Sequence, residues 1–539
     1  MRDSYLRLLC LAGLLLAGAG GCHRKGGAGA GSLALTPPAE LGVIIGSLAE
    51  VVKPGPIAVE GYGLVGGLAG TGSGYCPPEV RTYLRQYILT QLPNERVNVD
   101  ELIKSRNTAV VALEGTIPAL PSMDEHFDVR VSLLPGSEAT SIQGGWLYKS
   151  ELVVKGTFGV RTRPLATVAG PVFSNVIGTT AVDLRNGYIL GGGRTLYEYT
   201  AVLKLRKPDY RAASLIRNRL CERYGANIAQ ALSPGDISIR IPAEYRQRKP
   251  RFLALIPATF LEVTNELAEA RINTYSQELA SGDRENSEIV LEAVGRQSAD
   301  QLASLLNASE AEVRLRAGRC LWSLGDDRGL APLRDLALDP NSPYRLEALD
   351  AVMIPPRRAE AVTLAQRLLR EEDKAIVLAA YESLRRIDDL SVSREFIGRS
   401  FLLEQVAQSS HKAIFVSRSG DPRVVLFGSP LPCRDNLFVE APDQTVVLNA
   451  RAGQDHIAIS RKHPTRPGIV GPVRSRPNVA DVVRTLGGEP VNTASGQVQN
   501  LGVSYAQVVA ILQQMTVKDA VTAEFWAGPL PKIEPPVKK

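Results

Sequence analysis

The chain has 539 residues, too many for one hydrophobic core, so we expect at least three domains. Its 62 Lys and Arg residues against 56 Asp and Glu residues give a net charge of +6, which is small for this length and does not predict nucleic-acid binding. Aromatic residues make up 6% of the chain and are spread out, so no base-stacking surface is expected either.

The N-terminus is typical of an exported protein. Two arginines precede an apolar run over residues 8–17, which has the length of a signal peptide and is too short to span a bilayer. Small residues then lead to Cys22, as in the processing site of a bacterial lipoprotein, which predicts lipidation of Cys22. Cleavage by the ordinary signal peptidase is the alternative. We therefore assign residues 1–21 to a lipoprotein-type signal peptide and residues 22–36, rich in Gly and Ala, to a flexible tether.

Residues 37–260 mix helix and strand patterns and are expected to form one α+β domain. Its first notable feature is the glycine-rich stretch 61–72. No lysine of the P-loop type follows it, so nucleotide binding is not expected, and the glycines instead predict close backbone approach at a turn or sheet edge. Periodicity predicts helices over residues 80–92 and 210–224. Alternation predicts strands over residues 108–113, 127–132, 152–160, 200–205 and 236–242.

Residues 261–400 are almost entirely helical in pattern and contain an internal repeat. Ala317, Ala348 and Ala379 stand 31 residues apart, each within a similar local sequence, and each is expected to open the second helix of a repeat. This resembles HEAT-type repeats, which stack helix pairs into a solenoid. An irregular helical bundle is the alternative. Charged residues of this region are expected on its solvated outer face, namely Arg314, Arg316, Arg319 and Glu347.

Strand patterns return after the repeats. Residues 401–475 form a β-rich segment with strands expected over 413–416 and 444–448, and residues 476–530 form a segment with helices over 479–486 and 504–515. The predicted fold class is therefore a multidomain α+β protein, with an inserted HEAT-like α-solenoid and a small β-rich segment.

We find no arrangement of residues that predicts catalysis, and therefore expect no enzyme activity, cofactor or metal. Asp455, His456 and His463 could be drawn as a metal or acid–base cluster, but solvated loop residues are the simpler interpretation. The trio 124–126 is likewise expected to be a surface turn, and Ser73 lacks the context of a nucleophile. The remaining cysteines have no metal-ligand spacing, and their disulfide pairing is left open: Cys76, Cys221, Cys320 and Cys433.

Several blocks, in order, resemble the flagellar P-ring protein family over residues 40–260 and 476–525. The blocks are the glycine-rich stretch 61–72, Asn107–Ala112 before Pro118, Phe127–Val131, Ser141–Leu147, Leu203–Ile216, Gly235–Pro242 and Leu501–Gln513. The residues that we assign to the family signature are Gly61, Tyr62, Gly63, Gly67, Gly70, Gly72, Gly144 and Gly145.

The resemblance implies a non-enzymatic subunit of a flagellar basal-body P-ring, or of a P-ring-like ring, in the periplasm. It implies a homo-oligomeric ring around the rod in the peptidoglycan layer, with rod and L-ring proteins as partners and no nucleic acid. Lipid on Cys22 would add an outer-membrane anchor. The lipoprotein-type signal and the repeats depart from the family's usual pattern, so the alternative is a non-flagellar envelope lipoprotein scaffold whose HEAT-like solenoid binds a protein partner.

Overall fold

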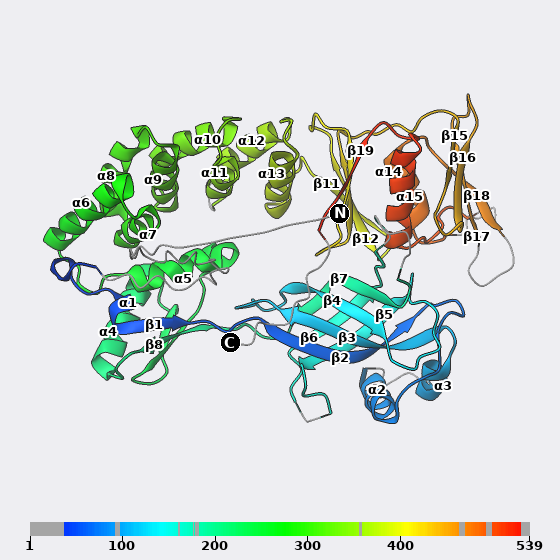
Figure 1. Ribbon diagram of the computed structural model, residues 1–539, viewed down its shortest axis with the longest axis horizontal. Helices are drawn as coiled ribbons and strands as arrows, with labels where there is room; N and C mark the ends of the chain where they lie inside the picture. Colours follow the sequence, from blue (N-terminus) through cyan, green and yellow to red (C-terminus); the bar gives the residue numbers. More distant parts are fainter. Residues whose placement is uncertain are drawn as a thin grey trace, which may run out of the picture.

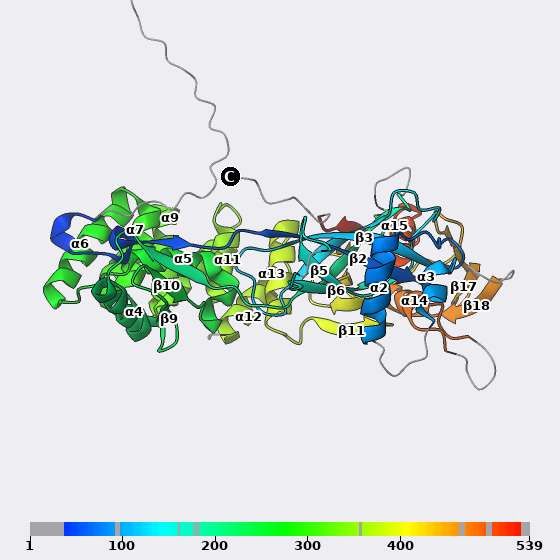
Figure 2. The same cartoon turned by 90° about the horizontal axis from the view of Figure 1, so that it is seen from below.

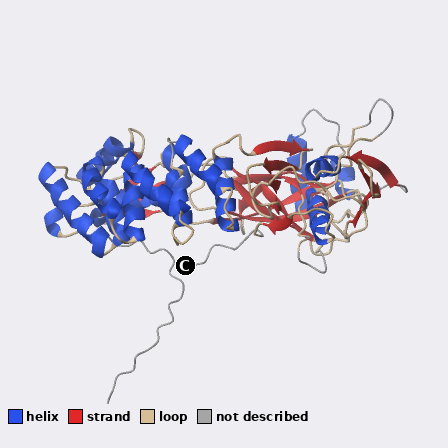
Figure 3. Ribbon diagram, turned by 90° about the horizontal axis from the view of Figure 1, so that it is seen from above, coloured by secondary structure: helices blue, strands red, loops and turns tan. Residues whose placement is uncertain are grey.

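The protein was analysed as a computed structural model, which describes residues 37–529 except 92–97, 160–161, 176, 178–182, 355–357, 463–468 and 492–497. The chain forms a β-barrel, a small α/β layer, a helical repeat region and a C-terminal domain (Figure 1). The helical repeats occupy one half of an elongated molecule and most of the strands occupy the other (Figure 3). The predicted multidomain α+β class is confirmed.

The barrel is a closed antiparallel sheet with the strand order β2-β3-β4-β7-β6-β5. Its strands are β2 (Ile57–Gly66), β3 (Thr108–Ile117), β4 (His126–Leu133), β5 (Trp146–Val154), β6 (Ala166–Pro171) and β7 (Asn186–Thr195). Alternate residues such as Val129 and Val131 are fully buried, because successive side chains of a strand point to opposite faces. Two helices cover the outside of the barrel near β2, α2 (Pro78–Gln91) and α3 (Val99–Lys104) (Figure 1).

The strand expected over residues 152–160 is misplaced. The observed strand β5 runs from Trp146 to Val154, so only its last three residues overlap the prediction. Two glycines with left-handed backbone, Gly156 (φ 86°) and Gly159 (φ 89°), end the extended segment earlier than its apolar pattern suggested.

The α/β layer contains a four-stranded antiparallel sheet in the order β1-β8-β10-β9. Its strands are β1 (Ala49–Val52), β8 (Ala201–Leu205), β9 (Ala229–Ala231) and β10 (Asp236–Ile239). The helices of this layer are α1 (Ile45–Leu48), α4 (Tyr210–Tyr224) and α5 (Lys249–Ala258), with short 3-10 turns at Ala39–Leu41 and Ala243–Arg248. Helix α4 has the predicted bounds, because the side chain of Asp209 caps its first turn and Gly225 ends it.

The repeat region is a row of packed helices that leads from α5 to the C-terminal domain (Figures 1 and 2). Its helices are α6 (Asn265–Ser281), α7 (Arg284–Val294), α8 (Ala299–Ser304), α9 (Ala311–Ser323), α10 (Leu330–Leu338), α11 (Arg345–Val352), α12 (Arg358–Leu368) and α13 (Lys374–Arg386). The repeated alanines lie inside α9, α11 and α13 and do not begin them, which corrects the expectation. Ala317 and Ala348 are fully buried, as close contact between helices requires.

The C-terminal domain places two helices between two sheets. A five-stranded sheet has the order β11-β12-β14-β13-β19 and a four-stranded sheet the order β15-β16-β17-β18. The strands are β11 (Ser393–Ile397), β12 (Phe401–Val406), β13 (Ala413–Val416), β14 (Arg423–Phe427), β15 (Leu437–Glu440), β16 (Val446–Ala450), β17 (Ile457–Lys462), β18 (Ile469–Ser475) and β19 (Glu524–Ala527).

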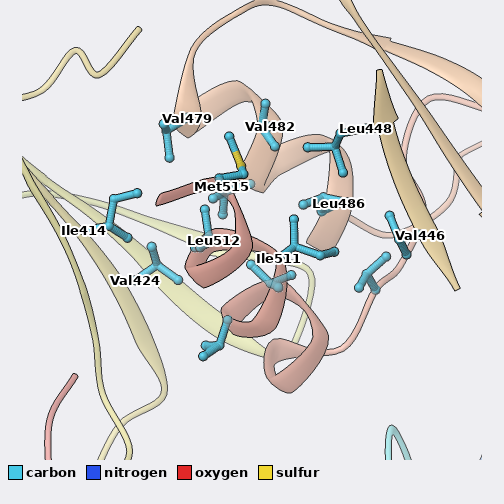
Figure 4. Packing of buried hydrophobic residues seen from close by; sticks show 14 of the residues in the cluster. Ile414, Val424, Val446, Leu448, Val479, Val482, Leu486, Ile511, Leu512 and Met515 are labelled. Carbon is cyan, nitrogen blue, oxygen red and sulfur yellow. The ribbon is translucent and has the colours of Figure 1, made fainter. Parts of the chain in front are cut away.

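Helices α14 (Val479–Gly487) and α15 (Tyr505–Val517) fill the space between these sheets. Figure 4 shows Ile511, Leu512 and Met515 of α15 among buried side chains of both sheets and of α14. The segments predicted separately over residues 401–475 and 476–530 therefore share one hydrophobic core, and β19 completes a sheet of the first segment.

Candidate functional site: a glycine-lined groove

The first signature glycines allow strands β2 and β5 to approach each other closely. A Cβ atom on Gly61 would lie 2.3 Å from the carbonyl oxygen of Glu151, and one on Gly63 would lie 2.5 Å from Oγ of Ser150. Both distances are far below van der Waals contact. At Gly61 the obstacle is backbone, so a larger residue would push the strands apart, whereas at Gly63 the side chains of Ser150 and Leu147 would have to move. Tyr62, between them, points outward and meets Phe158 edge-on with a ring-centroid distance of 4.5 Å.

The remaining glycines of the stretch shape the turn that follows β2. Gly67 (φ 77°) and Gly70 (φ 93°) adopt left-handed backbone, which costs other residues energy. Gly72 instead packs against backbone, because a Cβ atom there would lie 2.1 Å from the carbonyl oxygen of Thr108. Thr71 ties the turn to the second signature block by donating from Oγ1 to the carbonyl oxygen of Ser141 at 2.9 Å.

The second signature block, Ser141–Leu147, packs directly on this turn. A Cβ atom on Gly145 would lie 2.4 Å from Cγ1 of Val65, and Gly144 has left-handed backbone (φ 71°). The two blocks, 70 residues apart in sequence at Thr71 and Ser141, therefore form one end of the barrel. This agrees with the predicted need for close backbone approach, and the closely approaching backbones belong to this same chain.

This end of the barrel forms one wall of a groove of about 600 Å³ whose other wall is the C-terminal domain. Glycines of both walls line it: Gly66, Gly67, Gly144 and Gly145 of the barrel, and Gly398, Gly487 and Gly502 of the C-terminal domain. Arg461 also lines it, with Nη1 donating to the carbonyl oxygens of Leu501 and Gly502. Burial lowers the pKa of Arg461, and its Nε has no hydrogen-bond partner among the described residues. Exposed glycines stand on both walls, Gly67 and Gly144 on the barrel and Gly502 on the C-terminal domain, so the groove is suited to an extended polypeptide segment.

Asp128 joins the barrel to the C-terminal domain. Its carboxylate accepts hydrogen bonds from Oγ of Ser419 at 2.8 Å and from the backbone N–H of Gly420 at 3.0 Å. The same carboxylate accepts from the N–H of Gly191 on β7 at 2.7 Å. This joint connects the two walls of the groove, together with the packing of Phe173 and Leu190 in the core of the C-terminal domain.

A buried ion cluster attaches the repeat region to the α/β layer. Glu288 of α7 is completely buried and accepts from Arg251 of α5 at 2.8 Å, from Arg316 at 3.0 Å and from Arg319 at 2.6 Å. Burial alone would raise the pKa of Glu288, but the three guanidinium groups hold that pKa below its ordinary value. Arg316 and Arg319 are thus not on a solvated outer face, which corrects the prediction. Glu347 is exposed, as expected.

A second buried carboxylate attaches the other end of the repeats. Glu404 on β12 is completely buried and accepts from the hydroxyl of Tyr381 and from Nε of Arg385 at 3.1 Å, both on α13. Arg385 also pairs with Asp421 at 2.7 Å. The repeat region is therefore held at both ends and connects the α/β layer to the C-terminal domain as a strut.

The histidines, carboxylates and serine that we considered as catalytic or metal-binding candidates make ordinary contacts with neighbouring residues. Asp455 and His456 form an isolated pair at 2.7 Å on the surface, and His463 lies outside the described residues. His126 contacts the carbonyl oxygen of Gly191 at 2.7 Å, and Glu125 pairs with Lys249. Ser73 accepts from the N–H of Tyr75. Over the described ranges there is no group of three or more His, Cys, Asp and Glu residues that could hold a metal ion.

Sequence patterns did not identify several of these groups. Glu288, Glu404 and Asp128 form joints between residues far apart in the chain, so no local pattern marks them. The four cysteines of the described chain are free: Cys76, Cys221, Cys320 and Cys433. Cys22 lies outside the described residues. No helix in the described part of the chain combines the length and apolar character needed to span a bilayer.

Comparison with known proteins finds a family that is similar to residues 45–284. The sequence model of the family "Flagellar P-ring protein" matches residues 45–284, from α1 to the first residue of α7. Residues 45–284 resemble flagellar P-ring proteins. The match contains the barrel, the α/β layer and both signature blocks, and it extends beyond the expected limit at residue 260. The model for HEAT repeats matches residues 299–385, which confirms the repeat assignment.

Individual P-ring proteins support this result. A flagellar P-ring protein of Helicobacter pylori is 29% identical over 218 residues, which cover 39% of this chain and 60% of that protein. Flagellar P-ring protein 1 of Photobacterium profundum is 32% identical over 239 residues, covering 41% and 61% respectively. The flagellar P-ring protein of Shewanella woodyi is 28% identical over 235 residues, covering 41% and 62%. The chain thus matches about three fifths of the length of these relatives, and the similarity expected over residues 476–525 stays a prediction.

Proposed function

We propose that this protein is a non-catalytic subunit of a flagellar P-ring, or of a ring of the same type, in the periplasmic envelope. The observation that carries the proposal is the P-ring match over residues 45–284, which contains the whole barrel and both signature blocks. A closed ring needs repeated head-to-tail contacts between identical subunits. Its function then depends on packing surfaces, and no bound cofactor is required. Rod and L-ring proteins and the peptidoglycan layer are the proposed surroundings.

The glycine-lined groove is the surface we assign to a neighbouring subunit. It lies where the P-ring-like barrel meets the C-terminal domain, and glycines of both line it. The repeat region is held at both ends and is better suited to set the distance between domains than to capture a partner alone. The comparisons favour the ring over the non-flagellar scaffold.

Isolation of basal bodies tests the proposal. In a strain that carries a tagged copy, electron microscopy with antibody labelling should place the protein in a ring around the rod, and its deletion should abolish that ring and swimming. Basal bodies that keep their rings and lack the tagged protein would contradict the flagellar role and favour the scaffold.

We also propose that Cys22 is the lipidated first residue of the mature protein. The support is its position after small residues at the end of the apolar run. Mass spectrometry of the mature N-terminus should show a diacylglyceryl-modified Cys22. A free N-terminus at another residue would reject lipidation and indicate ordinary cleavage, whatever the outcome for the ring.

A further inference from the structure

A second hollow lies where the α/β layer faces the repeat region. It has a volume of about 180 Å³, and its walls come from the 3-10 turn Ala243–Arg248, from α11 with the two residues after it, and from the end of α13. We call it the arginine hollow, because Arg246 and Arg248 of the turn and Arg386 of α13 line it. It shares no lining residue with the glycine-lined groove.

The arginines of the hollow are poorly paired within the described part of the chain. Among the described residues, the side chains of Arg246 and Arg248 have no hydrogen-bond or ion-pair partner. Cζ of Arg248 lies 5.3 Å from the centroid of the Tyr245 ring, a contact that orients the guanidinium group. Arg386 approaches Asp350 only to 3.8 Å, which is longer than a hydrogen bond. Burial lowers the pKa of Arg248, so the surrounding carboxylates compensate its charge only in part.

The balance of charge in the hollow favours a ligand with one negative charge. Glu244 and Asp350 also line it and oppose the three arginines, which leaves an excess of one positive charge. Arg248 is half-buried, and Arg246 and Arg386 are exposed, so an incoming group can reach their guanidinium groups. Guanidinium groups bind carboxylates through paired hydrogen bonds. One carboxylate would balance the charge, whereas a phosphate dianion would exceed it.

The size and the apolar part of the hollow favour a single side chain. Met353 and Ile354 line it, each with 7% of its surface exposed, so methylene groups next to a carboxylate would find an apolar contact there. Sites for small molecules usually have volumes of about 300–1,000 Å³, and this hollow is smaller. A glutamate side chain, with two methylene groups and one carboxylate, combines the required length and charge.

We propose that the arginine hollow receives a glutamate side chain of a protein partner. The carboxylate would accept hydrogen bonds from Arg248 and from the exposed arginines at the rim, and the methylene groups would lie on Met353 and Ile354. Arginine is enriched at interfaces between proteins. Because the turn belongs to the α/β layer and the other walls belong to the repeat region, such a partner would contact both parts at once.

Methyl NMR of the full-length protein tests the proposal, with Met353 and Ile354 as reporters. The probe is glutamate blocked as the N-acetyl N-methylamide, whose only charge is the side-chain carboxylate. We expect saturable shifts of both methyl signals at millimolar probe concentrations, and weaker binding at higher salt. The blocked glutamine, which has the same shape and no charge, should give no saturable shift. Inorganic phosphate should bind more weakly than the blocked glutamate, because it has no methylene groups.

Two substitutions should change the affinity in opposite directions. Arg248→Gln should weaken binding about tenfold, because it removes charge-assisted hydrogen bonds to the carboxylate. Asp350→Asn should tighten binding about two- to fivefold, because it removes a carboxylate that repels the ligand. The matched control is Arg240→Gln, an exposed arginine of the same layer outside the hollow, which should leave the affinity unchanged. A merely structural role of Arg248 does not predict the gain in Asp350→Asn, so this variant decides even if Arg248→Gln lowers thermal stability.

Three results of the titration would each overturn the proposal: no saturable shift, equal binding of the blocked glutamine, or phosphate binding as tight as that of the blocked glutamate. Unchanged affinity in both Arg248→Gln and Asp350→Asn would overturn it as well. The titration measures binding to one chain, so its outcome does not depend on whether the protein forms a ring.

Discussion

Single glycines set the distance between strands at the signature end of the barrel. An alanine at Gly61 would place its Cβ atom 2.3 Å from the backbone oxygen of Glu151, which no side-chain rotation can relieve. We expect Gly61→Ala to destabilise local pairing of β2 with β5 by about 1–3 kcal/mol, as overpacking does elsewhere. Hydrogen–deuterium exchange of peptides from these two strands measures the effect. Gly55→Ala is the matched control, because no atom lies within 4 Å of its Cβ position, and it should exchange as the wild type does.

At the scale of elements, the Glu288 cluster holds helix α7 between α5 and α9. Glu288→Gln would remove the buried negative charge that Arg251, Arg316 and Arg319 share, leaving Arg251 with Glu292 and Arg316 with Glu312. We expect a loss of about 3–5 kcal/mol in the stability of this joint. Glu285→Gln on the exposed side of the same helix should change stability by less than about 0.5 kcal/mol. Thermal unfolding followed by circular dichroism compares the two variants. Equal midpoints would show that the cluster does not hold the joint.

The same cluster predicts an acid dependence. The pKa of Glu288 is lower in the folded protein than its ordinary value of about 4.5, so the stability that it contributes is fully present above that value. That stability is lost as the pH falls through the lower, folded pKa. The midpoint of the wild type should therefore fall more steeply between about pH 5 and pH 3 than that of Glu288→Gln. Parallel curves would contradict this assignment.

The elements also show what a sequence can and cannot predict here. The sequence predicts helix α4 with its observed bounds because local residues encode them. Asp209 caps the start of the helix, apolar residues at helical spacing form its buried face, and Gly225 ends it. The glycines of the signature were identified, but the barrel was not, because the pairing of β2 with β5 closes over about 90 residues of sequence. Arg316 was placed on the surface because its partner Glu288 is 28 residues earlier. The groove also lay beyond prediction, since its two walls are joined by Asp128 and Gly420, 292 residues apart.

At the scale of the whole molecule, the α/β layer, the repeats, the C-terminal domain and the barrel are each joined to the next, and the last is joined back to the first by the chain itself. The α/β layer holds the repeats, the repeats hold the C-terminal domain, and Asp128 joins that domain back to the barrel. Such a circuit fixes the angle between the P-ring-like part and the C-terminal domain, and in a ring that angle would contribute to the curvature. Asp128→Ala removes the acceptor for Ser419 and Gly420 while the barrel core stays intact.

We therefore expect Asp128→Ala to fold and to accumulate normally, but to show a wider distribution of distances between barrel and C-terminal domain by small-angle X-ray scattering. The same variant should enter basal-body rings less often than the wild type, because a variable angle prevents uniform closure. Asp455→Ala is the control, since that carboxylate is almost fully exposed and pairs with His456 on the surface. If the Asp128 variant scatters and assembles like this control, the Asp128 joint does not set the interdomain angle.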